Sequence, residues 1–428
     1  MALTADASDF SAGRTARGHA YVSAGMKTLL DRLVTVWIFM GGMIIVEPSP
    51  YEFVFAIVAP VALFAGLKLY RSTLPLIILA IIFTPFAIIG AFQATYTPVT
   101  TTVFYALTSV FLLLTGYFLA NYVTENPQER MRRIMRAYTA IAVISAAAGT
   151  AGYLHLVPES LYDILTRYGR AKGFFQDPNV YGPFLIPAAI FALQRMMLGA
   201  RRAILLNAAI VMVILVGLFV SFSRAAWGSL AASVIILFAL TYILEANARN
   251  KVRMLILALA GAAVLSATMV GLLSIPSIGS LFSQRATVAE AYDSGETGRF
   301  GRQGYAFDLA LQHPLGLGPN EFAHLDIAED AHDTYVTVIF VYGWGGALCF
   351  YAILVLTLVK AFGALPKPSP NRRLLIPLIA AFVPLVVEAG IIDIDHWRYF
   401  YLLIGLIWGV TSGYRRLAPA EDKLTALV

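Results

Sequence analysis

The chain has 428 residues, of which 59% are hydrophobic and 13% are charged, with a formal net charge of +6. Soluble domains carry about 25% charged residues, and no stretch of this chain has enough charge to coat a globule of about 150 residues. The composition therefore excludes a soluble protein and predicts an all-α, polytopic membrane protein. The single cysteine, Cys349, lies in an apolar run, which excludes a disulfide framework and a cysteine metal site within one chain.

About twelve segments are apolar and long enough to be transmembrane helices, which need about twenty mainly apolar residues. They cover residues 33–47, 51–67, 73–93, 102–122, 134–156, 179–197, 203–220, 225–244, 254–274, 334–359, 374–391 and 398–413. The bundle is expected over residues 29–413, between a disordered tail at 1–28 and a second tail at 414–428. The first apolar run lacks a small-x-small cleavage pattern, so we expect an anchor and not a removed signal peptide.

Basic residues are distributed unequally between the two sets of loops that join these helices. One set, which includes both chain ends, holds 23 of the 31 Lys and Arg residues. Because cytoplasmic loops carry the excess of Lys and Arg, both termini are expected to be cytoplasmic. Topology thus accounts for the basic charge, and no nucleic-acid partner is expected. The other loops hold the remaining eight basic residues: Arg167, Arg170, Lys172, Arg224, Arg285, Arg299, Arg302 and Arg398.

The connections expected on the outward, periplasmic side span residues 157–178, 275–333 and 388–398. In the longest of them, RFGRQGYAFDLALQ has the pattern of a short helix at the membrane interface, with Phe300, Phe307 and Leu311 toward the lipid or the bundle. The following HPLGLGPNEF contains two prolines and two glycines, which end a helix and build turns. The loop between the ninth and tenth spans is therefore expected to have structure of its own.

Two outward arginines are expected at the membrane boundary. Arg170 lies in GRAKGFFQDPNVYGPFL, where the glycines and Asp-Pro-Asn predict a loop that turns back into the bundle before a helix near Asn179. Arg224 lies in SFSRAAWGS, between two apolar runs with almost no loop, so its charge must be paired or contact an anion. Arginine suits a diphosphate because its planar fork donates two parallel hydrogen bonds and keeps its charge. The alternatives are a loop ion pair for Arg170, and lipid phosphate or an acid of a neighbouring helix for Arg224.

His332 and Asp333 stand where an acidic segment meets the tenth apolar run. An imidazole at the outer membrane boundary can take a proton from a hydroxyl near neutral pH. Asp333 is a candidate helix N-cap and a candidate partner that orients the imidazole. The alternative is a structural histidine at the start of a helix. His313, which precedes a proline in a turn, and His324 are the competing histidines.

Four segments together resemble the bacterial O-antigen ligase and polymerase superfamily, which are integral membrane glycosyltransferases that use lipid-linked glycans. These segments are RAKGFFQDPN at 170–179, FSRAAWG at 222–228, GRFGRQGYAFDLALQHPLGLGPNEF at 298–322 and HDTYVTVIFVYGWGG at 332–346. In the ligase pattern, a histidine and a small amide or hydroxyl residue precede nine residues and Gly-x-x-Gly. His332, Gly343 and Gly346 fit this pattern, but Asp333 stands where the ligases usually have Asn, Ser or Gln. This departure favours the polymerases over the ligases.

The resemblance also implies a site and a reaction. Arginines at the positions of Arg170 and Arg224, with Arg299 at the start of the outer-loop helix, would hold the diphosphate of an undecaprenyl-linked glycan donor; Arg302 fits the motif less well. His332 would activate a sugar hydroxyl of the acceptor, which is another lipid-linked unit for a polymerase or the lipopolysaccharide core for a ligase. The implied reaction builds O-antigen or exopolysaccharide at the bacterial inner membrane, without nucleotide sugar, cofactor or metal. A chain-length regulator is a further candidate partner.

Other functions stay open on the sequence alone. A transporter or flippase of lipid-linked solutes is expected to have two related halves and broken helices at the midplane, and the sequence shows no such repeat. A peptidoglycan-type glycosyltransferase is expected to use a carboxylate in an outer loop, with Asp293, Glu296 or Asp330 as candidates. A divalent-cation site is also conceivable before the tenth run, although a charged loop rim is the commoner explanation. Its candidate ligands are Asp326, Glu329, Asp330 and Asp333.

Overall fold

The computed structural model describes residues 25–285, 298–325 and 331–417. Within these ranges the chain is almost entirely helical, and each apolar segment predicted to span the membrane overlaps a helix. The predicted all-α fold class is therefore confirmed. Most of the two expected tails lies outside the described residues.

The main helices follow the predicted spans closely. They are a helix over residues 25–40, α2 (Pro50–Phe64), α3 (Leu74–Gln93), α4 (Val99–Glu125), α5 (Pro127–Tyr153), α7 (Pro178–Leu198), α8 (Ile204–Phe219), α9 (Arg224–Leu244), α10 (Ala248–Leu273), α13 (Thr334–Ala364), α14 (Arg372–Glu388) and α15 (Arg398–Leu417). The connections add α6 (Glu159–Leu165), α11 (Pro276–Arg285), α12 (Arg299–Gln312) and the 3-10 turns η1 (Arg71–Thr73), η2 (Arg201–Ala203) and η3 (Phe322–His324).

Eight of the described helices are long and apolar enough to cross a membrane: α3 with η1, α4, α5, α7, α8, α9, α10 and α13. Two other helices at predicted spans are shorter. α2 has 15 residues, and α14 has 17 residues with prolines at 377 and 384 inside it. The multi-pass helical character of the protein is thus confirmed.

The first span lies earlier in the chain than the sequence predicts. The prediction is 33–47, whereas the helix covers 25–40 and turns or irregular structure follow it up to Ser49. Gly42 packs tightly, because a Cβ there would lie 2.5 Å from Cγ1 of Ile141. The apolar residues beyond the glycine lie against the first outer connection, where the N–H of Ile44 donates to the carbonyl oxygen of Phe174 at 2.7 Å. Hydropathy alone does not separate such residues from a membrane helix.

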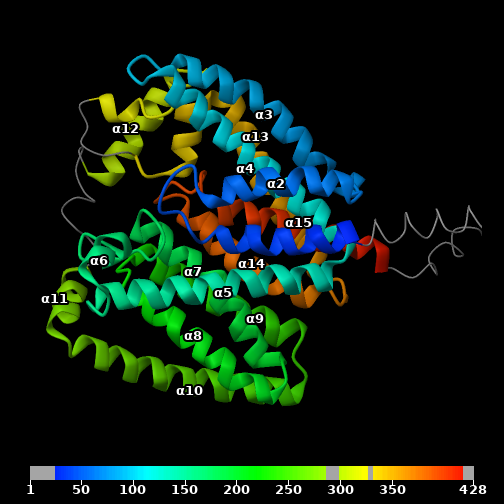
Figure 1. Cartoon of the computed structure of the whole chain (residues 1–428), viewed down its shortest axis with the longest axis vertical. Helices are drawn as coiled ribbons and strands as arrows, with labels where there is room; N and C mark the ends of the chain where they lie inside the picture. Colours follow the sequence, from blue (N-terminus) through cyan, green and yellow to red (C-terminus); the bar gives the residue numbers. More distant parts are fainter. Residues whose placement is uncertain (1–24, 286–297, 326–330, 418–428) are drawn as a thin grey trace, which may run out of the picture.

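The helices form a bundle in which the described ends of the chain lie at the same end (Figure 1). The short helices α6, α11 and α12 lie at the opposite end, which we call the outer end. α15 packs along α4, α13 packs along α3, and α7 contacts α5, α8, α9 and α14. α10 lies at the edge of the bundle, and its most apolar window contains no buried residue among those described.

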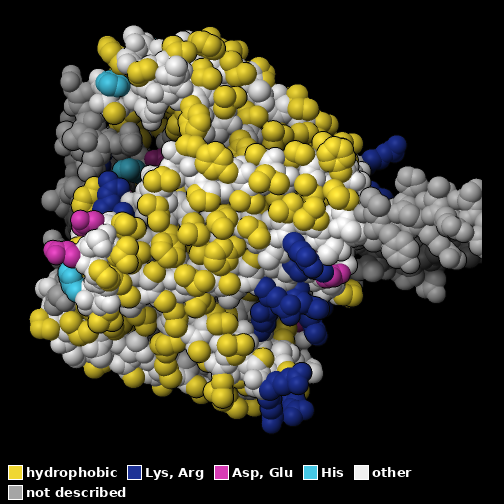
Figure 2. Space-filling view, in the orientation of Figure 1, with side chains coloured by type: hydrophobic (Ala, Val, Ile, Leu, Met, Phe, Trp, Pro, Cys, Tyr) yellow, Lys and Arg dark blue, Asp and Glu magenta, His cyan; other side chains and the backbone are white. Residues whose placement is uncertain are grey.

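Hydrophobic side chains cover most of the visible surface between the two ends (Figure 2). The Lys and Arg side chains in this view gather mainly at the end that carries the chain termini. An apolar belt bounded by a basic end is the surface expected of a protein that spans a bilayer.

The turn after α12 docks on a kink in α13. Gly343 has φ 69° and ψ −178° inside α13, a conformation that glycine adopts without steric cost. The N–H of Trp344 donates to the carbonyl oxygen of Pro314 at 3.0 Å, and Nε1 of the same indole donates to the carbonyl oxygen of Ala310, also at 3.0 Å. A Cβ at Gly343 would lie 2.4 Å from the Pro314 oxygen. The Gly-x-x-Gly segment therefore fixes the long outer loop against α13.

Candidate active site

The first outer connection turns back into the bundle, as the sequence predicts, and it does so as a β-hairpin, which the sequence does not predict. β1 (Thr166–Arg167) pairs antiparallel with β2 (Arg170–Ala171), and the two residues between them, Tyr168 and Gly169, have φ of 54° and 66°. A two-residue turn with positive φ matches the twist of the strands. The N–H of Ala171 donates to the carbonyl oxygen of Val220 at 3.0 Å. The hairpin is thereby docked on the turn between α8 and α9.

Arg170 points its guanidinium into the bundle and is only 6% exposed. Its Nε donates to the carbonyl oxygen of Ser221, and its Nη2 donates to Oδ1 of Asn179, both at 2.7 Å. Asn179 is itself placed by the N-cap of α7, because its N–H donates to the Asp177 side chain at 2.7 Å. Hydrogen bonds to charged groups are worth about 1.5–3 kcal/mol each. The two bonds therefore fix the plane of the guanidinium.

Arg224 is the first residue of α9 and follows a four-residue turn after α8. The sequence predicts this near-absence of a loop. Phe222 in the turn has φ 48°, which is uncommon for a bulky residue. Ser223 caps α9, accepting from the N–H of Ala226 at 3.4 Å. This tight turn, which also supplies the acceptor for Arg170, places the two predicted arginines in the wall of the same cavity.

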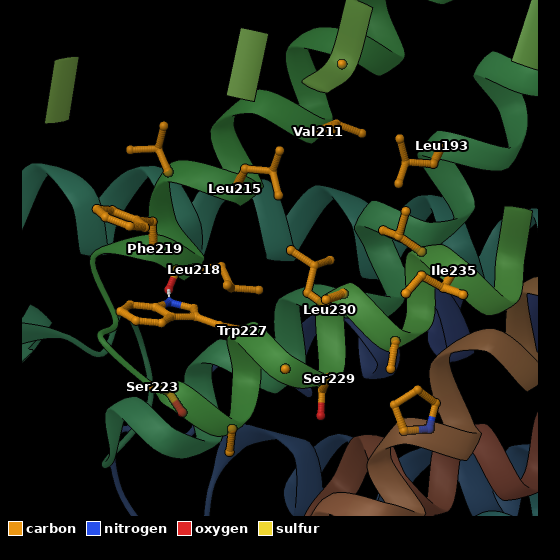
Figure 3. Close-up of a pocket in the computed structure, with 18 of the residues that line it drawn as sticks. Leu193, Val211, Leu215, Leu218, Phe219, Ser223, Trp227, Ser229, Leu230 and Ile235 are labelled. Carbon is orange, nitrogen blue, oxygen red and sulfur yellow. Dashed lines mark hydrogen bonds between the residues drawn. The ribbon is translucent and has the colours of Figure 1, made fainter. Parts of the chain in front are cut away.

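The cavity has a volume of about 1840 Å³ and extends between α8, α9 and α10. Its walls are mainly apolar, as Figure 3 shows for side chains of α8 and α9 such as Leu215, Phe219, Trp227 and Leu230. Polar groups join the lining at the outer end, where α7 and α9 begin: Arg170, Asn179, Ser223 and Arg224. The space thus combines an apolar trough at membrane depth with a cationic outer end.

His332 precedes α13 and has an unusual backbone conformation, with φ 50°. Its Nδ1 lies 3.6 Å from Oδ2 of Asp393, which is within ion-pair distance but longer than a hydrogen bond. The other carboxylate oxygen of Asp393 accepts from Oγ1 of Thr337 at 2.6 Å. Gln303 of α12 donates to the carbonyl oxygens of His332 and Gly390, both at 3.3 Å. Three outer segments therefore meet around the imidazole.

Asp333 acts as the N-cap of α13, as predicted. Its carboxylate accepts from the N–H groups of Tyr335 at 2.8 Å and Val336 at 3.3 Å. Burial raises the pKa of Asp333, and these backbone hydrogen bonds oppose the shift. The carboxylate that faces Nδ1 of His332 is that of Asp393.

The connection between α14 and α15 joins His332 to the cavity wall. The N–H of Thr334 donates to the carbonyl oxygen of Ala389, and its Oγ1 donates to the carbonyl oxygen of Ile392, both at 2.8 Å. Ile392 lines the cavity, whereas the next residue, Asp393, faces His332. This connection therefore contacts both His332 and the cavity, although His332 itself is not among the residues that line the cavity.

A buried polar cluster follows Asp393 in the same connection. Nε2 of His396 lies 2.7 Å from Oγ of Ser109, and the hydroxyl of Tyr105 donates to Oδ2 of Asp395 at 3.3 Å. Burial, reinforced by Asp393, raises the pKa of Asp395 to about 7. Burial, reinforced by the charge of an arginine two residues along, lowers the pKa of His396 to about 3. The two adjacent groups thus favour their neutral forms.

The remaining arginines and carboxylates named as site candidates from the sequence lie on α12 or outside the described residues. The backbone of Arg299 begins α12, but its side chain lies outside the described residues. Arg302 lies one turn further on and is buried. The outer-loop carboxylates named as rival catalytic groups or cation ligands lie outside the described residues, except the helix cap: Asp293, Glu296, Asp326, Glu329 and Asp330.

Arg398 and Arg167, two further outward basic residues, also have structural partners. Arg398 is 6% exposed and pairs with Glu47 at 3.1 Å and Glu52 at 2.8 Å. Arg167 donates from Nη1 to the carbonyl oxygen of Gln176 at 3.0 Å. These contacts show that an outward arginine in this chain is not in itself a mark of a binding site.

The sequence reasoning missed the residues that hold the site together. Asn179 and Asp393 lie in stretches already singled out, but nothing in their spacing pairs them with Arg170 or His332. The acceptor on Ser221 is a backbone carbonyl, which carries no sequence signal. Gln303 was hidden in the helical pattern of α12.

Comparison with known proteins bears on the same region. Residues 208–351 match the family model described as O-antigen ligase. The match includes Arg224, Arg299, His332 and the Gly-x-x-Gly segment, and Arg170 precedes it. No match is found among curated proteins. Over residues 208–351, which include Arg224 and His332, the chain is therefore similar to the O-antigen ligase family.

Proposed function

We propose that this protein transfers a glycan from a polyprenyl diphosphate carrier, undecaprenyl diphosphate in bacteria, to a hydroxyl of a sugar acceptor. The observation that carries the proposal is the cavity, which combines an apolar trough of about 1840 Å³ with Arg170 and Arg224 at its outer end. A polyprenyl diphosphate has the same two parts, a long apolar chain and an anionic head. Apolar walls favour the chain, and fixed guanidiniums favour the diphosphate.

The reaction breaks the bond between the anomeric carbon of the donor and an oxygen of the diphosphate. The same carbon forms a new bond to the acceptor oxygen, whose proton passes to the imidazole of His332, and polyprenyl diphosphate leaves. Arg170 and Arg224 stabilise the negative charge that grows on the leaving group, and such preorganised charges are strongest where water is excluded. Arginine supplies this charge without a metal ion, so the proposed step is metal-independent.

His332 serves as the base in this proposal, and Asp393 positions it. A carboxylate facing Nδ1 favours the tautomer in which Nε2 is free to accept a proton, and it stabilises the imidazolium that forms. The distance of 3.6 Å between Nδ1 and Oδ2 leaves room for a small side-chain rotation to close a hydrogen bond. Asp333, by capping α13, supports the backbone of the residue that carries the base.

The proposed orientation puts the outer end in the periplasm and both termini in the cytoplasm, with the protein in the inner membrane. It rests on the excess of Lys and Arg at the end that carries the termini. A donor flipped across the membrane would present its glycan at the outer end. The acceptor is another lipid-linked unit for a polymerase or the lipopolysaccharide core for a ligase.

The direct test is a transfer assay with the purified protein, a polyprenyl diphosphate-linked glycan and each acceptor. We expect a new glycosidic product and one released polyprenyl diphosphate for each bond formed. A matched assay in sealed liposomes follows the side on which the glycan is exposed. Movement of intact donor across the bilayer without release of polyprenyl diphosphate would contradict transfer and support a flippase.

The surface glycan of a strain lacking the gene separates the two acceptors. Single repeats on an otherwise intact lipopolysaccharide core indicate a polymerase. Complete loss of glycan attachment indicates a ligase.

A further inference from the structure

The apolar cavity reaches the end of the bundle that carries the termini, far from the proposed reaction. Its lining includes Met197 at the end of α7, Ile204 at the start of α8 and Met254 near the start of α10. The apolar lining therefore extends to the inner end of the bundle. α10, which forms one wall, has no buried residue among those described in its most apolar window, so the wall borders lipid.

Three arginines lie in the chain segments that lead into the inner lining residues Ile204 and Met254. Arg253, adjacent to Met254, donates from Nη1 to the carbonyl oxygen of Gly199 at 2.7 Å. Its Nε and Nη2 are buried and have no hydrogen-bond partner in the part of the chain that the structure describes. Arg201 and Arg249 lie close enough to repel the charge of Arg253. We call Arg201, Arg249 and Arg253 the inner arginine cluster.

The inner arginine cluster differs from other basic groups of the bundle. Arg130 pairs with Glu125 at 2.8 Å and with Asp31 at 3.5 Å, and Arg372 pairs with Glu245 at 2.5 Å. Among the described residues, none of the three arginines of the inner cluster forms an ion pair with a carboxylate. The positive-inside bias explains why arginines lie at this end, but it does not explain buried donors beside an apolar cavity. An anion from outside the chain would satisfy both features.

We propose that the inner arginine cluster binds the phosphate of an anionic glycerophospholipid whose acyl chains enter the inner half of the cavity beside α10. Basic pockets between membrane helices are suited to such headgroups. The N-termini of α8 and α10 both lie at this end and add their positive dipole ends to the charge of the arginines. The apolar walls favour a phospholipid over a free anion, because they bury acyl chains.

The lipid would share the cavity with the proposed donor, but its binding is measured without a glycan donor, so failure of this proposal and failure of the proposed transfer are distinguishable. Full-length protein in detergent is titrated with dioleoylphosphatidylglycerol, dioleoylphosphatidylcholine or glycerol phosphate, and binding is read by native mass spectrometry. We expect phosphatidylglycerol to bind at least tenfold more tightly than phosphatidylcholine. We expect glycerol phosphate to compete weakly.

The variant that tests the cluster is Arg201→Gln with Arg249→Gln, which leaves the bond between Arg253 and Gly199 in place. Each basic residue near a membrane surface contributes about fivefold to binding of anionic lipid, so the double variant should bind phosphatidylglycerol about 25-fold more weakly. The matched control is Arg373→Gln, because Arg373 shares Glu245 with a second arginine. It should bind as the wild type does.

Three results would overturn the proposal. The first is equal binding of phosphatidylglycerol and phosphatidylcholine by the wild type. The second is unchanged phosphatidylglycerol binding by the double variant. The third is glycerol phosphate binding as tightly as the lipid, which would make this a site for a free anion.

Discussion

The outer and inner ends of the bundle both carry arginines, yet the surroundings of these arginines differ. At the outer end, a hairpin and a four-residue turn hold Arg170 against a backbone carbonyl and a side-chain amide. His332 lies at the same end, just before α13, where the next helix residue Thr334 bonds to the connection between α14 and α15. At the inner end, the arginines face one another, and no base and carboxylate pair accompanies them among the described residues. Charge alone therefore does not identify a catalytic site. What distinguishes the outer end is the set of neighbours that orient Arg170, together with a histidine at the same end that can accept a proton.

The largest effect is expected at the histidine. Replacing His332 with Ala should lower the transfer rate by about 10²–10⁴-fold, because a general base contributes on this scale. Binding of the polyprenyl diphosphate donor should stay near the wild-type value. The assay is release of polyprenyl diphosphate by purified protein.

His324→Ala is the matched control, since His324 also lies at the outer end of the bundle, where its ring is 5.5 Å from that of Tyr96 and tilted by 30° to it. This variant should retain transfer. If His332→Ala were as active as His324→Ala, the histidine-base mechanism would be wrong, and a carboxylate of the outer loop would become the better candidate.

Replacing an outer arginine with lysine should lower kcat/KM even though the positive charge is kept. In Arg170→Lys, the ammonium cannot hold Ser221 and Asn179 and still present two parallel donors to a diphosphate. The loss of one charge-assisted hydrogen bond should lower kcat/KM by roughly 10–100-fold. Arg224→Lys is expected to act in the same direction.

The control for this pair is Arg167→Lys on the same hairpin, where the arginine is largely exposed and donates to a backbone carbonyl. Its kcat/KM should change less than twofold, since exposed pairs contribute about 0–1 kcal/mol. Equal losses in Arg167→Lys and Arg170→Lys would show that hairpin stability, and not diphosphate binding, is being measured.

A smaller effect is expected at Asp393. Asp393→Asn keeps an oxygen to accept from Thr337 but removes the charge that faces Nδ1 of His332. We expect kcat to fall about tenfold, the loss of one hydrogen bond to a charged group, with the KM for donor unchanged. A rise in KM with unchanged kcat would place Asp393 in substrate binding instead.

The smallest effect concerns stability and the pair Asp395 and His396 behind the site. Asp395 has a pKa of about 7 in the fold, against about 4 when unfolded, so its contribution to stability is lost as pH rises through this window. His396 has a pKa of about 3 in the fold, against about 6.5 unfolded, so its contribution is lost as pH falls. The two effects oppose each other between about pH 4 and 6.5.

Thermal unfolding of purified protein at several pH values measures this balance. The wild-type Tm should change little across the window. Asp395→Asn should show a Tm that rises with pH, and His396→Gln a Tm that falls with pH. Parallel profiles for the two variants would contradict the assignment of opposite slopes. Phosphatidylglycerol binding at the inner end should not follow pH in this range, because arginine stays charged.

The fold was largely predictable because long apolar runs and the Lys and Arg bias are local signals. The start of α9 at Arg224 and the cap at Asp333 could be read in this way, as could the amphipathic helix α12. The misplaced first span shows the limit, since the apolar residues after Gly42 pack on another segment outside a helix. Partners such as Asp393, 61 residues after His332, depend on how α14 and α15 return to the outer end. No local pattern encodes that approach.

The most direct test is an experimental structure of the protein with an unreactive polyprenyl diphosphate-linked analogue. The account predicts the diphosphate between the guanidiniums of Arg170 and Arg224, the prenyl chain along α8, α9 and α10, and the first sugar within reach of the imidazole of His332. A diphosphate bound at the inner arginine cluster, or an imidazole turned away from the bound sugar, would contradict it.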